Sequence, residues 1–118
     1  MYTKNNNEQI VLFDVDDTLI SFQPVEGQAG VEPIEIVNDG HKSYIYPITK
    51  VIEKLKEHKA RNHYVRVHSK GGKEWAETVI KALHLENFVD NIETKPCWYY
   101  DDLPADEWMF RVNYGVKH

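Results

Sequence analysis

The chain has few cysteines and no long apolar run. Cys97 is the only cysteine among 118 residues, so no disulfide can form within the chain and no oxidising compartment is needed. No stretch approaches the length of a membrane span, and residues 1–9 lack the apolar segment of a signal peptide. These absences predict a cytoplasmic protein with no membrane partner.

An excess of positive charge is also missing. The chain carries 14 Lys and Arg against 19 Asp and Glu, a net charge of −5, which gives no general attraction for nucleic acid. A polynucleotide would need a local patch, for which Lys70, Lys73 and Arg66 are the best candidates. Six histidines are present, but no pair has the spacing of one helical face, and His63 and His68 would point to opposite sides of a strand. Zinc is therefore not indicated.

Apolar runs alternate with amphipathic stretches along the whole chain. Strands are expected at 10–13, 63–68 and 97–100, with shorter ones near 88–92 and 110–116. Helical spacing of apolar residues predicts helices over 48–55 and 75–83, and we interpret Trp75 in the second of these as a core residue. A chain of this length can bury about two thirds of its unfolded surface. The pattern predicts one α/β domain over residues 1–118.

Three carboxylates and a hydroxyl follow the first apolar strand. Because alternate residues of a strand point the same way, Asp14 and Asp16 are expected to converge while Val15 turns into the protein. Two carboxylates held that close repel each other unless a cation lies between them. The spacing therefore predicts a metal ion at the end of this strand.

Ser69, Gly71 and Gly72 follow the expected strand at 63–68 and precede a helix. A hydroxyl and two glycines at such a junction allow backbone N–H groups and Ser69 Oγ to surround a phosphoryl oxygen. An ordinary glycine turn would have the same sequence, so this segment alone does not decide between the two.

A second set of carboxylates follows the expected strand at 97–100. Asp101 and Asp102 come directly after it, and with the first pair they would form an all-oxygen site suited to Mg²⁺. An Asx-type helix cap ahead of Leu103 and Pro104 is the alternative interpretation, and both can hold together.

These segments together resemble the haloacid dehalogenase (HAD) superfamily of aspartate-nucleophile phosphatases. Asp14, Asp16, Thr18 and Leu19 match its first motif, and the Ser69 turn, the lysine before Pro96 and the second acidic pair follow in the family's order across nearly the whole chain. The resemblance implies a Rossmann-like fold of three layers, a parallel sheet flanked by helices.

The resemblance also implies a mechanism, Mg²⁺-dependent hydrolysis of a phosphomonoester through an aspartyl phosphate. Asp14 would be the nucleophile, and Asp16 would protonate the leaving oxygen and then deprotonate water. Ser69, Gly71, Gly72 and Lys95 would bind the phosphate, and Thr18 would support the Asp14 loop and the phosphate. Lys95 would also neutralise charge, with Lys70, Lys73 and Lys81 as substitutes. Asp14, Asp16 and Asp102 would bind the metal, and Asp101 or Asp106 would orient Asp102.

Residues 31–46 are expected to form a hairpin after the first strand. Asp39 and Gly40 mark its turn, which would pair Ile34 with Ile45 and Ile36 with Ser43. We predict a flap whose Tyr44, Tyr46 and His41 meet the leaving group. The segment is too short for a folded cap domain, so the resemblance points to a capless member with an open site, suited to a small phosphomonoester or an exposed phosphate on a larger molecule.

Two other functions remain open. A phosphorylation-dependent receiver domain also combines an acidic pair with a hydroxyl and a lysine, but its acceptor aspartate comes from a later strand. The closer alternative is a catalytically silent HAD-fold protein that binds metal and phosphate in a regulatory role.

Overall fold

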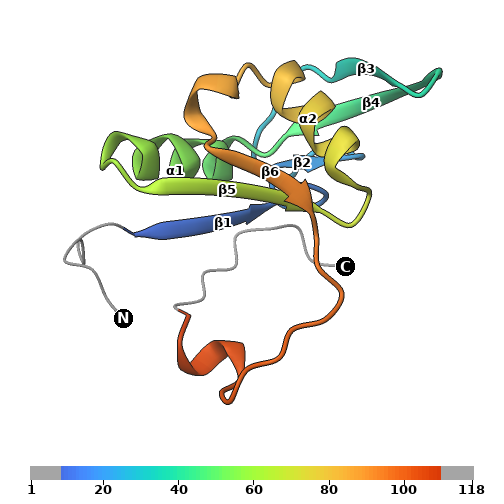
Figure 1. Cartoon of the computed structure of the whole chain (residues 1–118). Helices are drawn as coiled ribbons and strands as arrows, with labels where there is room; N and C mark the ends of the chain where they lie inside the picture. The colour runs from blue at the N-terminus through green and yellow to red at the C-terminus, as the bar shows by residue number, and fades with distance from the viewer. Residues whose placement is uncertain (1–8, 110–118) are drawn as a thin grey trace.

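Two small sheets and two helices make up most of the protein in the computed structural model, which describes residues 9–109 (Figure 1). A parallel sheet has the order β1-β5-β6, and an antiparallel sheet has the order β2-β4-β3. The elements are β1 (Ile10–Asp14), β2 (Ile20–Ser21), β3 (Ile34–Asn38), β4 (His41–Pro47), α1 (Thr49–Ala60), β5 (Tyr64–Ser69), α2 (Lys73–Ala82), the 3-10 helix η1 (Glu86–Phe88), β6 (Asn91–Thr94) and the 3-10 helix η2 (Ala105–Glu107). The predicted α/β class is confirmed.

One face of the parallel sheet forms the core. Phe13, Val65 and Val67 are buried on this face, because alternate residues of β1 and β5 point the same way. They join one apolar cluster with residues of both helices: Val51 and Leu55 of α1, and Ala76, Val79 and Ile80 of α2. The helical spacing seen in the sequence therefore reports the sides of α1 and α2 that face the sheet.

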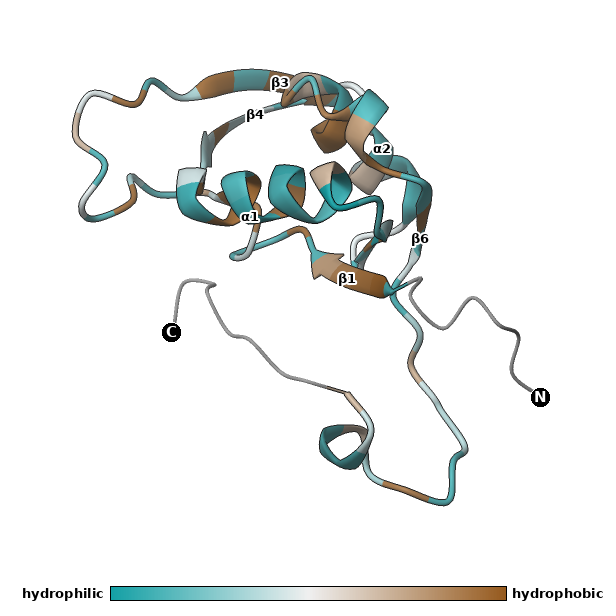
Figure 2. Cartoon of the chain, turned by 90° about the vertical axis from the view of Figure 1, so that its left-hand side faces the viewer, coloured by the Kyte–Doolittle hydropathy of each residue, from teal (hydrophilic) through white to brown (hydrophobic). Residues whose placement is uncertain are grey.

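The opposite face of the parallel sheet is open in the described part of the chain. Ile10, Leu12 and Tyr64 alternate with the core residues and expose 63%, 36% and 38% of their surface. Figures 1 and 2 show α1 and α2 on the same side of the sheet. The expected third layer is thus not formed by residues 9–109. Right-handed crossovers from β1 to β5 and from β5 to β6 advance in one direction across the sheet, so they place both helices on one face.

The predicted hairpin is confirmed with its predicted register. Ile34 pairs with Ile45 and Ile36 with Ser43, and the turn residues Asp39 and Gly40 both have positive φ, as a two-residue hairpin turn requires. Ile36 and Ile45 are buried in the core, and β3 packs against α2. The hairpin therefore contributes buried residues to the core and is not only an exposed flap.

The chain after β6 leaves the body of the molecule as an extended segment, here called the arm (residues 96–109) (Figure 1). The predicted strand at 97–100 is wrong, since these residues pair with no strand and Trp98, Tyr99 and Tyr100 are 80%, 60% and 92% exposed. Their apolar character was the only signal for a strand, and a strand also needs a partner.

Two smaller predictions concern the same half of the chain. The short strand expected near 88–92 begins later, because 86–88 form η1 and β6 begins at Asn91. The strand expected over 110–116 lies outside the described residues. None of the helices within residues 9–109 has the length and apolarity to cross a bilayer.

Candidate active site

The carboxyl ends of the three parallel strands meet at one edge of the sheet. Asp14 is paired in register with His68, His68 with Glu93, and Ser69 with Thr94, which directly precedes Lys95. Open α/β sheets place their ligands at this edge because the loops there converge. The strand pairing therefore gathers Asp14, Ser69 and Lys95 from segments that are more than fifty and more than twenty residues apart.

Asp14 is the centre of this group. Lys95 Nζ lies 3.8 Å from Asp14 Oδ1, and His68 Nε2 lies 4.0 Å from the same oxygen. The Asp14 side chain is one-third exposed, so an incoming group can reach it. Burial lowers the pKa of His68, which favours the neutral imidazole. Lys95 is thus the permanent positive charge beside the Asp14 carboxylate.

Asp16 is held by an indole. Trp75 Nε1–H donates a hydrogen bond of 2.8 Å to Asp16 Oδ1. Partial burial raises the pKa of Asp16, the Trp75 hydrogen bond opposes that rise, and the nearby carboxylates of Asp14 and Asp17 add to it. The balance retains a proton on Asp16 to higher pH than on an ordinary aspartate, a property that suits an acid and base catalyst.

A tight turn separates the two aspartates from β2. The N–H groups of Thr18, Leu19 and Ile20 all donate to the carbonyl of Val15, and Asp17 has a positive φ of 64°. Thr18 thus contributes its backbone N–H to this turn, and the support of the Asp14 loop by Thr18 stays a prediction. Its contact with a phosphate stays a prediction.

The turn after β5 needs both of its glycines. Gly72 has a φ of 107°, which disfavours any side chain, and a Cβ on Gly71 would lie 3.0 Å from Trp75 Cδ1 and 3.3 Å from Ser69 Oγ. Ser69 is buried, and its Oγ accepts a hydrogen bond of 3.0 Å from Gly71 N–H. Its own O–H proton therefore remains as a donor to an incoming oxygen, whereas Gly71 N–H is already engaged.

The backbone fixes Lys95 beside this turn. Lys95 N–H donates a hydrogen bond of 2.9 Å to the Ser69 carbonyl, which continues the pairing of β5 with β6 by one residue. Of the substitutes, Lys73 Nζ lies 3.7 Å from Glu77 on its own helix. Within residues 9–109, Lys95 is the lysine placed at Asp14.

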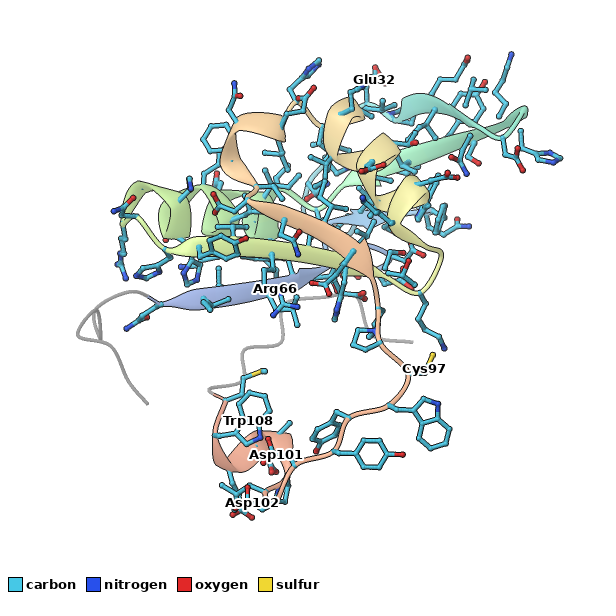
Figure 3. The ribbon with its side chains drawn as sticks, in the orientation of Figure 1. Glu32, Arg66, Cys97, Asp101, Asp102 and Trp108 are labelled. Atoms are coloured by element: carbon cyan, nitrogen blue, oxygen red, sulfur yellow. The ribbon has the colours of Figure 1, made fainter. Side chains whose placement is uncertain are left out.

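The structure does not bring Asp102 to Asp14 and Asp16. Asp101 and Asp102 lie on the arm, well away from the sheet (Figure 3). Asp101 Oδ1 accepts a hydrogen bond of 3.1 Å from Leu103 N–H, a local turn just ahead of η2, whose own N-cap residue is Pro104. Asp106 belongs to η2 on the same arm. Within the described part of the chain, no three His, Cys, Asp or Glu residues are grouped as a metal site.

Three residues of the site were not identified from the sequence. Trp75 was interpreted as core, although an indole N–H near the core needs a partner, and here it binds Asp16. The sequence indicates no site role for His68, and only the pairing of β1 with β5 reveals that it faces Asp14. Phe22, just after β2, stacks on Trp75 with ring centroids 6.2 Å apart.

The candidate patch for nucleic acid is partly neutralised. The Arg66 guanidinium forms an ion pair with Glu93 on the neighbouring strand, and Lys73 is paired with Glu77. Lys70 alone of the three has no carboxylate partner among the ion pairs of the described residues. Charge therefore gives no support for a polynucleotide substrate.

No protein-family model matches this sequence, and no curated protein matches it significantly. The resemblance to the HAD superfamily therefore depends on its short motifs and on the geometry just described.

Proposed function

We propose that this protein hydrolyses phosphomonoesters and that Asp14 is its nucleophile. The observation that carries the proposal is the convergence of Asp14, Ser69 and Lys95 at the ends of three neighbouring parallel strands, with Lys95 Nζ 3.8 Å from the Asp14 carboxylate. A carboxylate, a hydroxyl donor and a fixed cation around one open point are the groups that nucleophilic attack on a phosphate requires.

In the first step an Asp14 carboxylate oxygen attacks phosphorus, and the bond from phosphorus to the leaving oxygen breaks. Asp16 gives its proton to that oxygen, so an alcohol leaves and an aspartyl phosphate remains. Trp75 occupies Asp16 Oδ1, which directs Oδ2 toward the leaving oxygen. The raised pKa of Asp16 agrees with its carrying the proton.

In the second step water attacks the aspartyl phosphate. The Asp16 carboxylate takes a proton from the water, the bond from phosphorus to Asp14 breaks, and inorganic phosphate leaves. Asp16 is then protonated and Asp14 is again a carboxylate, so the cycle closes.

Other groups hold the phosphoryl oxygens. The Lys95 ammonium, 3.8 Å from Asp14, and Ser69 Oγ–H, at the end of the neighbouring strand, are the proposed donors to these oxygens. Lys95 also offsets the repulsion between the anionic nucleophile and an anionic substrate. Because the site edge has no cap domain over it, both a small phosphomonoester and an exposed phosphate on a larger molecule are candidate substrates.

Mg²⁺ can take part in the proposed reaction only if the arm moves so that Asp102 approaches Asp14 and Asp16. Asp14 and Asp16 supply oxygen ligands of the type that Mg²⁺ prefers, but Asp102, the third expected ligand, lies on the arm, and the residues do not form a complete site as they stand. The two chemical steps above therefore use protein groups alone.

We propose that the arm folds back against the open side of the sheet. Apolar residues are exposed on both surfaces, Ile10 and Leu12 on β1 and Trp98 and Tyr100 on the arm, and β1 is an edge strand of its sheet in the described residues. Burying such surface is favourable by about 25 cal/mol per Å². Such folding would carry Asp102 toward the end of β1.

Trapping the intermediate tests the function. Purified protein is mixed with an aryl phosphate, quenched in acid within the first turnovers and digested, and the peptide that contains Asp14 is weighed. We expect a mass increase of one phosphoryl group on that peptide, absent in Asp14→Asn, which has the same shape but a poor nucleophile. Turnover without any phosphorylated Asp14 peptide would exclude this mechanism.

The displaced position of Asp102 favours a second candidate function, that of a silent HAD-fold protein that binds phosphate or metal in a regulatory role. A protein of this kind would bind orthovanadate or inorganic phosphate at Asp14, Ser69 and Lys95 yet release no phosphate from any ester. Calorimetric binding of orthovanadate together with no turnover on an aryl phosphate would favour this candidate.

A further inference from the structure

Two aromatic rings lie beside the proposed acid. Trp75 stands in the first turn of α2, and its indole N–H is bonded to Asp16. Phe22 follows β2 directly, and its ring is nearly parallel to the indole, with an interplanar angle of 17° and a centroid distance of 6.2 Å. We call this pair the aromatic shelf (Phe22 and Trp75).

The shelf is fixed on its inner side and open on its outer side. Trp75 is partly buried against the core, and its Cδ1 would lie 3.0 Å from a Cβ placed on Gly71, so the indole fits closely against the Ser69 turn. Phe22 by contrast is 45% exposed. The exposed face of Phe22 is therefore an apolar aromatic surface that a second ring could cover.

The geometry points to a substrate whose leaving group carries a planar aromatic ring. This inference depends on the proposed function and extends it to the substrate class. Asp16 gives its proton to the leaving oxygen, so the group attached to that oxygen lies beside Asp16. The indole of Trp75 is in direct contact with Asp16, and the more exposed Phe22 ring stacks on that indole. A ring stacked there would cover Phe22 while its phosphate reaches Asp14.

Both aryl phosphates and nucleoside monophosphates present such a ring. The experiment therefore uses phenyl phosphate, adenosine 5′-monophosphate and glycerol phosphate, the last of which has the phosphate without a ring. For each compound kcat/KM is measured in the wild type and in Phe22→Leu, which retains apolar volume but loses the aromatic face. Phe22→Tyr restores that face, and Tyr64→Leu is the matched control, because Tyr64 is an exposed aromatic at the start of β5, at the opposite end of the parallel sheet from Asp14.

We expect Phe22→Leu to lower kcat/KM for the ring-bearing substrates by about tenfold relative to glycerol phosphate, since stacking of a ring on an aromatic side chain is worth about that factor. The loss should appear mainly in KM, Phe22→Tyr should recover it, and Tyr64→Leu should show no selective loss. Loss with phenyl phosphate alone would identify an aryl phosphate as the substrate type, and loss with both ring compounds would include nucleotides. Equal losses of kcat/KM on all three compounds would contradict the proposal that the shelf binds the ring of the leaving group.

Binding separates this inference from the proposed function. If the wild type hydrolyses none of the three compounds, the phosphatase proposal has failed, and calorimetry with the same compounds then judges the shelf. Tighter binding of a ring compound than of glycerol phosphate, lost in Phe22→Leu, would support the shelf without turnover. Equal affinities, or no binding of any compound, would contradict it.

Discussion

The body of the molecule (residues 10–95) and the arm both contain carboxylates and aromatic side chains, but the surroundings of these side chains differ. In the body, Asp14 lies beside Lys95, Asp16 accepts a hydrogen bond from Trp75, and the elements that carry these residues pack on one buried core. In the arm, Asp101 bonds to its near neighbours Asp102 and Leu103, and Trp98, Tyr99 and Tyr100 face solvent. Carboxylates and aromatic side chains therefore do not make a site or a core until other elements pack against them.

The same difference separates two kinds of sequence signal. Alternation of apolar and polar residues along β5 indicates which of its faces is buried, and the structure follows it. β1 is apolar at all of residues 10–13 and forms a strand because β5 pairs with it. The run at 97–100 is also apolar at four successive positions, a pattern that does not indicate which face would be buried or which strand would pair with it. The described structure has a radius of gyration of 15.2 Å, against about 13 Å for a compact domain of this size, because the arm stands apart.

The largest expected effect contrasts the acidic residues of the two regions. Asp14→Asn should lower kcat by at least about 10³-fold, because it removes the nucleophile, whereas Asp102→Asn should lower it by about 10- to 100-fold, because it removes one proposed metal ligand. Initial rates on an aryl phosphate give both values. Wild-type rates in Asp102→Asn would place the arm outside the active site, and wild-type rates in Asp14→Asn would exclude the nucleophile.

The next effect concerns magnesium and the position of the arm. If Mg²⁺ draws Asp102 to Asp14, chelation should reduce phosphatase activity to background, and added Mg²⁺ should restore it. Chymotrypsin, which cleaves after aromatic residues, should cut at Trp98 to Tyr100 rapidly in the chelated protein and slowly with Mg²⁺. Timed digests analysed by mass spectrometry measure this. Full activity after exhaustive chelation, with unchanged cleavage, would remove magnesium from the mechanism.

The third prediction compares how much a substitution in the body and a substitution in the arm lower the free energy of unfolding. Leu55→Ala deletes fully buried apolar volume of α1 and should lower the free energy of unfolding by about 2–5 kcal/mol. Trp98→Ala changes a side chain that is 80% exposed and should lower it by under about 0.5 kcal/mol in the absence of Mg²⁺. Urea unfolding followed by circular dichroism measures both changes. A larger cost of Trp98→Ala when Mg²⁺ is present would show that the arm docks on the body.

The smallest expected effect is a loss of stability in mild acid that originates in the body. His58 Nδ1 lies 2.9 Å from His63 Nδ1, and burial, followed by the charges of His63 and Arg61, lowers the pKa of His58. The remaining nearby charges are Glu57 and Lys54, and Phe13 contacts the His58 ring edge. Below about pH 6.5 the unfolded chain therefore takes up protons that folded His58 and His68 resist, so stability falls as pH falls.

Melting temperatures at pH 7.5 and 5.5 test this dependence. Asp16 acts with the opposite sign, because its raised pKa makes the folded state bind protons more readily than the unfolded chain. Comparing the wild type with His58→Phe isolates the histidine contribution. The melting temperature should fall between the two pH values in the wild type and fall less in His58→Phe. An equal fall in both proteins would show that His58 contributes nothing.

Much of the body could be predicted from the sequence, because its signals are local. The hairpin register follows from Asp39 and Gly40, and the helices follow from apolar spacing. The roles of His68 and Trp75 could not be predicted in this way. His68 meets Asp14 only because β5 pairs with β1 in one particular register, and Trp75 meets Asp16 across fifty-nine positions of sequence.

The third layer is not formed by the described residues, and the expected metal ligands are not grouped within them, for a related reason. The sequence shows that α1 and α2 are amphipathic, but the order β1-β5-β6 decides that both cover the same face. Likewise Asp101 and Asp102 follow an apolar run, but no strand pairs with that run in the described residues.

The sequence by itself determined the two helices, the hairpin, the buried side of β5, and the position of Asp14, Ser69 and Lys95 at strand ends, because backbone geometry converts short spacings into direction. The tertiary structure alone decided which strand ends are neighbours, which helix face meets which sheet face, and where the arm lies. These depend on contacts between distant segments, whose free energies no local pattern contains.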